Sequence, residues 1–185
     1  MIGNAMRARL VRSAGSGFAS NSSGMALVEF ALILPFLLLL FLAGTQLNLA
    51  LTADRKVTIL ARTVSDLVGQ STILTAADVN NIFDAAASVI YPFPATGVHA
   101  VVSLVATDKD GNTTVKWSAA RNATPLTAGD PVTIKNPQPN TAQILSTVQY
   151  DYTPPVPFAM IKAMTLSDTI QMRPRSTDSI IYKQQ

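Results

Sequence analysis

The chain has 185 residues, of which 48% are apolar and only 14% are charged, with no cysteine and a single histidine, His99. Soluble proteins carry about 25% charged residues, so the deficit indicates a membrane segment or an exterior of uncharged polar residues. The lack of cysteine excludes disulfides, thiolate metal sites and a cysteine nucleophile. One histidine leaves little room for a histidine metal site or a Ser-His-Asp relay.

The net charge of +3 comes from residues 1–24, which contain Arg7, Arg9 and Arg12 and no acid. In the rest of the chain, basic and acidic side chains are equal in number. A nucleic-acid-binding protein keeps a basic surface on its folded part, so nucleic acid is not an expected partner. A basic N-terminal tail before an apolar stretch is typical of a membrane topology signal.

The apolar stretch runs from Phe30 to Ala53 without a charged residue. A helix rises about 1.5 Å per residue, so roughly 20 residues cross a bilayer core. The arginines precede this stretch and Asp54, Arg55 and Lys56 follow it. This asymmetry predicts a single-pass membrane protein with a cytoplasmic N-terminus and an extracytoplasmic domain after the span.

Two other interpretations of the apolar stretch are less favoured. A cleaved secretory signal needs a small-x-small site, and Ala50-x-Thr52 is a poor candidate. A buried core helix this apolar would need a larger domain to cover it. Pro35 lies inside the stretch, where membrane helices tolerate proline; it is either a harmless kink or a bend suited to packing against other membrane helices.

Glu29 is the only glutamate, and it lies at the start of the apolar stretch. A charge at membrane depth costs about 2.5–3.5 kcal/mol on insertion scales, and less near the interface. Two interpretations follow. The carboxylate either lies at the headgroup level, where the positive end of the helix dipole favours it, or it has a cationic partner.

The residues around Glu29 carry a family resemblance. Gly24 precedes it after a short basic and polar leader, which resembles the processing site of type IV prepilins and pseudopilins. The longer string Gly24-Met25-Ala26-Leu27-Val28-Glu29-Phe30-Ala31-Leu32-Ile33-Leu34-Pro35 resembles the N-terminal segment of the TadE-like pseudopilins, or minor pilins, of the tight-adherence (Flp) pilus system. That segment has the approximate pattern G-x-x-x-V-E-F-A-L-x-x-P.

This resemblance implies roles for individual positions. A prepilin peptidase would cut after Gly24, Met25 would become the new N-terminus, and Glu29 would neutralise that amine or one on a neighbouring subunit. Phe30 and Pro35 would belong to the helix that packs against other subunits. The implied partners are the membrane, the peptidase, other pilin or pseudopilin subunits and the inner-membrane assembly platform, and the implied location is a bacterial inner membrane with a periplasmic domain.

Beyond the membrane segment, two helices are predicted. The first continues to a stop at Gly69, with an apolar stripe at helical spacing made of Val57, Leu60, Ala61, Val64, Leu67 and Val68. The second begins with the capping sequence Thr75-Ala76-Ala77-Asp78. Its apolar face comprises Val79, Ile82, Phe83, Ala86 and Ile90, and Pro92 and Pro94 end it.

Strands follow. Val98, Ala100, Val102 and Leu104 alternate, a turn follows at 108–112, and Val115, Trp117 and Ala119 are predicted to share one face of a second strand, which indicates a β-hairpin. A third strand is expected at 143–152, with Ile144, Ser146, Val148, Tyr150 and Tyr152 on one face. We also expect an exposed loop at 129–140, a short helix at 158–166 and a last strand at 169–173.

The predicted fold class is therefore α+β. A basic, cleaved leader (1–24) precedes a transmembrane helix (25–53), an amphipathic continuation of that helix (54–70) and a small pilin-like domain (71–185) with a helix and an antiparallel sheet.

No catalytic or cofactor site is predicted, and no small-molecule substrate. Asp108-x-Asp110-Gly111-Asn112 resembles part of a calcium loop but lacks the further acidic ligands, so a plain hairpin turn is favoured. His99 is expected at or near the surface rather than as a metal ligand. GxSxG, Walker and GxGxxG motifs are absent. The predicted function is a structural assembly component, not an enzyme; the alternative is a membrane-anchored extracytoplasmic binding module with an uncleaved anchor.

Overall fold

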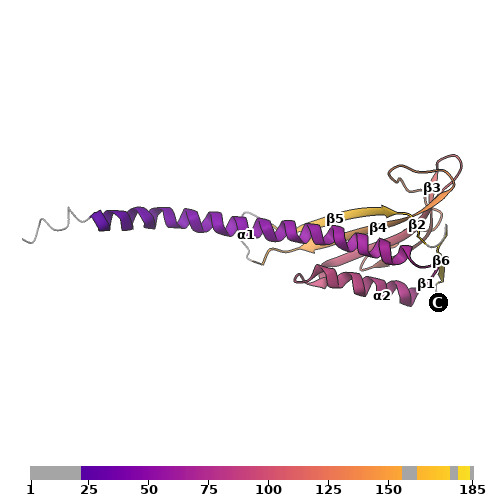
Figure 1. The fold of residues 1–185 in the computed structure, drawn as a ribbon, viewed down its shortest axis with the longest axis horizontal. Coiled ribbons are helices and arrows are strands. Elements are labelled where there is room, and N and C mark those ends of the chain that lie inside the picture. Colours follow the sequence, from indigo (N-terminus) through magenta and orange to yellow (C-terminus); the bar gives the residue numbers. More distant parts are fainter. Residues whose placement is uncertain (1–21, 156–161, 176–178, 184–185) are drawn as a thin grey trace, which may run out of the picture. The chain divides into compact units, whose positions relative to one another are not determined.

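The computed structural model describes residues 22–155, 162–175 and 179–183. The first helix, α1, spans Ser22–Gly69 and is followed by a second helix, two short 3-10 turns and six strands (Figure 1). Their bounds are β1 Ile73–Thr75, α2 Ala76–Ala87, η1 Ser88–Ile90, η2 Ala95–Gly97, β2 Val98–Thr107, β3 Thr113–Arg121, β4 Thr141–Tyr152, β5 Met164–Met172 and β6 Ile181–Lys183. The predicted α+β class is confirmed.

The chain divides into two compact units, Met1–Thr45 and Gln46–Gln185. The described part of the first unit is the beginning of α1, and α1 continues into the second unit up to the predicted stop at Gly69.

The second unit is built on a four-stranded antiparallel sheet with the order β3-β2-β4-β5. The hairpin of β2 and β3 is present as predicted, and β4 pairs with β2 from Val98↔Tyr150 to Thr107↔Thr141. A separate two-stranded parallel sheet joins β1 to β6 through Ile73↔Ile181, Leu74↔Tyr182 and Thr75↔Lys183.

The main core lies between one face of the large sheet and the two helices. The stripe predicted for the continuation of α1 is buried in this core except for Leu67, which is half-buried. Val79, Phe83 and Ala86 contribute from α2, and Tyr150 and Tyr152 from β4 are buried as predicted. The sheet residues of this core include Val98, Ala100, Val102, Leu104, Ala119, Ile144 and Val148.

Helix α2 begins at the predicted capping box. The Thr75 hydroxyl accepts the backbone N–H of Asp78 at 3.2 Å, and the Asp78 carboxylate accepts the backbone N–H of Thr75 at 2.9 Å. These two reciprocal bonds satisfy backbone donors that a helix start otherwise leaves unpaired. The side-chain and backbone hydrogen bonds from Thr75 also hold the pKa of the Asp78 carboxyl below its usual value.

Strand β3 departs from the predicted alternation. Leu104 pairs with Trp117 but Val105 pairs with Val115, so Lys116 is skipped in a β-bulge. Trp117 and Ala119 consequently lie against the main core, whereas Val115 packs with Val105, Ile134 and Leu145 in a second cluster on the opposite face. The prediction that Val115 shares a face with Trp117 and Ala119 is wrong, because one extra residue reverses the side to which a strand's side chains point.

The C-terminal region also differs from the prediction. Residues 158–161 of the expected helix at 158–166 lie outside the described residues, and Met164–Leu166 begin strand β5 instead of ending a helix. Strand β5 therefore starts before the strand predicted at 169–173. The last strand, β6, was not predicted. It lies beside Trp117, whose ring stacks on Tyr182 with centroids 5.1 Å apart and whose Nε1–H donates to the Ile180 carbonyl at 2.9 Å.

Candidate assembly segment on helix α1

The residues predicted to act in processing and assembly all lie on α1. Gly24, Met25, Glu29, Phe30 and Pro35 belong to one continuous helix, with Pro35 in its interior. Met25 and Glu29 are four residues apart, which places them on the same side of the helix with a rise of about 6 Å between them. Met25 is 76% exposed and Phe30 is 56% exposed, and a Cβ added at Gly24 would have no atom within 4 Å.

The first unit exposes a continuous apolar surface on which Glu29 is the one charged side chain between residues 24 and 45. Large side chains exposed there include Leu27, Leu32, Ile33, Phe36, Leu40 and Phe41. Soluble monomers rarely expose contiguous apolar patches larger than a few hundred Å². By length and composition this helix can cross a membrane.

In the second unit, the two sides of α1 differ in character. One side carries the buried stripe described above, with Ala53, Val57, Leu60 and Val64 almost fully buried. The other side is exposed and combines apolar with basic residues: Leu47, Leu51, Arg55, Ile59 and Arg62. We call these five residues the outer stripe of α1.

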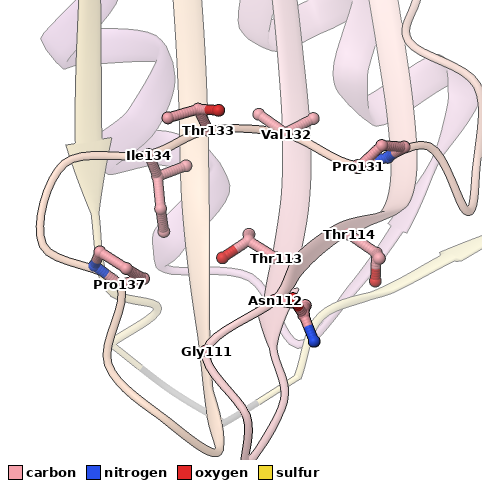
Figure 2. A pocket seen from close by; sticks show the side chains of 9 residues that line it. All are labelled: Gly111, Asn112, Thr113, Thr114, Pro131, Val132, Thr133, Ile134 and Pro137. Atoms are coloured by element: carbon pink, nitrogen blue, oxygen red, sulfur yellow. The ribbon is translucent and has the colours of Figure 1, made fainter.

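The second unit has a shallow hollow of about 410 Å³ at the hairpin turn. Figure 2 shows hairpin residues on one side of it and, on the other, the segment from Pro131 to Ile134, which crosses over the strands. Its lining contains no titratable side chain; the residues are Gly111, Asn112, Thr113, Thr114, Pro131, Val132, Thr133, Ile134 and Pro137. Threonine hydroxyls are present in this lining, but none of the lining side chains could act as a general base toward them.

The acidic turn beside this hollow is a hairpin turn, as predicted. The Asp108 carboxylate accepts the backbone N–H groups of Asp110 and Asn112 at 2.9 and 2.8 Å and the Asn112 side-chain amide at 3.1 Å. The bonds from Asn112 are the main reason that the pKa of Asp108 lies below its usual value. Within the described ranges, no group of three or more metal-ligating side chains comes together.

Comparison with family models matches residues 24–66 to the family described as TadE-like protein. The chain carries a TadE-like segment. The match begins at Gly24 and ends at Asp66, so it lies wholly within α1 and confirms the resemblance seen in the sequence. The matched residues make up less than half of the chain, so the family likeness is a property of this helix. Comparisons with curated proteins and with solved structures gave no match.

Sequence reasoning identified the start of the TadE-like segment but missed the outer stripe. The signal was present, because Leu47, Leu51 and Ile59 are large apolar residues that lie off the predicted core stripe. Their exposure depends on which side of α1 the sheet covers, and helical periodicity alone does not indicate which side that is.

Proposed function

We propose that the chain is a minor pilin or pseudopilin of a Tad (Flp)-type pilus or secretion system. A prepilin peptidase cuts after Gly24, and the mature protein packs through α1 with other subunits in the inner membrane, with its second unit in the periplasm. The observation that carries the proposal is the TadE-like match, which starts at Gly24 and follows one helix that includes the lone Glu29.

Charge pairing gives Glu29 its role. Cleavage leaves an ammonium group on Met25, four residues before Glu29 on a helix that is otherwise apolar up to Thr45. A buried charge without a partner is costly, so Glu29 pairs with the ammonium of a neighbouring subunit or of its own chain. Pairing between neighbours fixes the axial register of the packed helices, because any other register leaves both charges unpaired.

The outer stripe supplies a second packing surface in the same helix. Leu47, Leu51 and Ile59 are each about half exposed, and Arg55 and Arg62 lie among them. Apolar residues that contribute nothing to their own core are available for contact with another subunit.

The N-terminus of the membrane-bound protein tests processing. We expect mass spectrometry to find Met25 as the first residue in cells that contain the prepilin peptidase and Met1 in cells that lack it. Gly24→Val should block cleavage without disturbing the fold, since an added Cβ meets no atom within 4 Å. Gly44→Ala, at a helix position equally free of contacts, is the matched control and should be cleaved. An intact Met1 in peptidase-containing, pilus-forming cells would overturn the proposal.

Substitution of Glu29 tests the charge pairing. Glu29→Ala and Glu29→Gln should insert into the membrane and be cleaved normally, yet fail to assemble. Asp54→Asn removes an exposed acid from the same helix and should assemble as the unmodified protein does. Normal pilus formation by Glu29→Ala would refute the pairing mechanism.

A helix replacement separates this proposal from the binding-module alternative, for which the hollow at the hairpin turn is one candidate site. Residues 25–45 are replaced with an unrelated apolar helix of equal length, which leaves the second unit intact from Gln46 onward. We expect the chimera to stay in the membrane with a folded second unit but to lose pilus assembly. Retained biological function would favour the binding module.

A further inference from the structure

One end of the four-stranded sheet is joined through the chain's single histidine. His99 lies on β2, and its Nδ1 is 2.6 Å from the carbonyl oxygen of Asn122, which directly follows β3. Its Nε2 is 3.1 Å from Oδ2 of Asp151 on β4. The hydroxyl of Thr165, on β5, donates to the other oxygen of Asp151 at 2.8 Å. Residues from all four strands or their ends thus meet around His99.

Both oxygens that face the imidazole accept hydrogen bonds and cannot donate them. A backbone carbonyl and an ionised carboxylate are acceptors only, and a neutral imidazole carries a single N–H. Only the doubly protonated ring can donate to Asn122 and Asp151 together. In the neutral ring one nitrogen lone pair would face an oxygen lone pair, so the observed arrangement selects the imidazolium.

The surrounding charges agree with this assignment. The hydrogen bond to the Asn122 carbonyl is the largest cause of a raised His99 pKa, with Asp151 adding to it and partial burial opposing it. Asp151 is the charged group that faces the ring within the described residues. Arg121 is adjacent in sequence to Asn122, but it forms its ion pair with Asp84 of α2.

Asn122, one of the two residues that His99 contacts, is also the first residue of a long loop after β3. Asn122 has a left-handed backbone (φ 53°), and its side-chain amide donates to the Val98 carbonyl at 3.0 Å. The loop that begins here supplies Ile134 to the second cluster, which lies on the face of the sheet opposite the main core. His99 therefore links this loop to the end of β4 and, through Asp151, to the start of β5.

We propose that His99 is a pH-sensitive bridge: when protonated it holds Asn122 and Asp151 together, and when deprotonated it releases Asp151 and loosens this end of the sheet. Because the pKa of His99 is raised in the folded chain, the stabilisation is fully present below the unfolded value of about 6.5. It is lost as the pH rises through the raised folded pKa. The extracytoplasmic unit would thus be held more firmly in a mildly acidic medium than in an alkaline one.

Histidine NMR of the full chain in detergent micelles tests the bridge directly. With a histidine-free affinity tag and ¹³C-labelled histidine, the spectrum contains one imidazole, since the chain has one histidine. We expect a His99 pKa above the ordinary value of about 6.5. Asp151→Asn should lower this pKa, and Asp110→Asn, an exposed acid at the hairpin turn, should leave it unchanged. A pKa at or below the ordinary value, or one unaffected by Asp151→Asn, would overturn the proposal.

Amide hydrogen exchange gives a second test. If the contact at His99 did not depend on pH, the corrected exchange rates nearby would be the same above and below the His99 pKa. After correction for intrinsic rates, amides near Asp151 and Thr165 should exchange more slowly below the His99 pKa than above it. In His99→Gln, a neutral side chain at the same position, this difference should disappear. Its persistence in His99→Gln would show that another group controls this end of the sheet.

Discussion

The side of α1 that carries the buried stripe, called its inner side below, should determine the stability of the second unit. The substitution Leu60→Ala tests this. Leu60 is 1% exposed within the main core, whereas its neighbour Ile59 is 51% exposed on the outer stripe. Truncating a buried leucine removes its transfer free energy and leaves a cavity, at a cost of about 2.7–5 kcal/mol. Truncating an exposed side chain usually changes the free energy of unfolding by no more than about 0.5 kcal/mol. We therefore expect a loss of about 3 kcal/mol for Leu60→Ala and almost none for Ile59→Ala.

Urea unfolding of the full chain in micelles measures this difference. Trp117 is the only tryptophan, and because it contacts Tyr182 and Ile180 its fluorescence reports on the second unit. With a slope of about 1–3 kcal/mol per molar urea, the Leu60→Ala midpoint should fall by about 1–3 M. If Leu60→Ala costs under 1 kcal/mol, or Ile59→Ala costs as much as Leu60→Ala, the assignment of inner and outer sides is wrong. Ile59→Ala should instead weaken pilus assembly.

Three further substitutions probe the second unit in the same unfolding assay. Thr75→Ala removes one half of the capping box and should cost about 1 kcal/mol, with Thr75→Ser as the conservative control. Ser146→Ala should be neutral or stabilising, since the buried Ser146 hydroxyl has no hydrogen-bond partner among the described residues; a loss of 1 kcal/mol or more would reveal an unrecognised partner. Gly97→Ala should lower the free energy of unfolding by about 1–3 kcal/mol, because the added Cβ would lie 3.1 Å from Tyr150 Cε2 and 3.2 Å from the Asp151 carbonyl oxygen. An unchanged urea midpoint would show that these neighbours move aside at no cost.

The helices and the faces of β2 and β4 could be predicted because local chemistry determines them. The stripe from Val57 to Val68 has helical spacing, and Thr75 and Asp78 form a capping box at a distance of three residues. Alternation in β2 and β4 places the same residues in the core as the structure does. In each case the pattern that predicts the structure lies within a short stretch of sequence, so no contact with a distant segment is needed to recognise it.

The bulge and the short strands could not be predicted in this way. Lys116 has no local property that marks it as the extra residue of a bulge, because the bulge is a property of two strands in register. Strands β1 and β6 have three residues each and come from distant parts of the sequence, so neither shows a measurable alternation. The bridge at His99 likewise depends on Asn122 and Asp151, which only the assembled sheet brings to it.

The TadE-like match runs from Gly24 to Asp66 and so includes the part of α1 that belongs to the second unit. Helix α1 in the second unit is constrained on two sides, because its inner residues fill a core while its outer stripe stays exposed. If the outer stripe contacts other subunits, inner substitutions should impair assembly only as far as they unfold the second unit, while outer substitutions should impair it in a fully folded protein. Measuring stability and assembly on the same set of α1 variants would therefore separate the two roles of one helix.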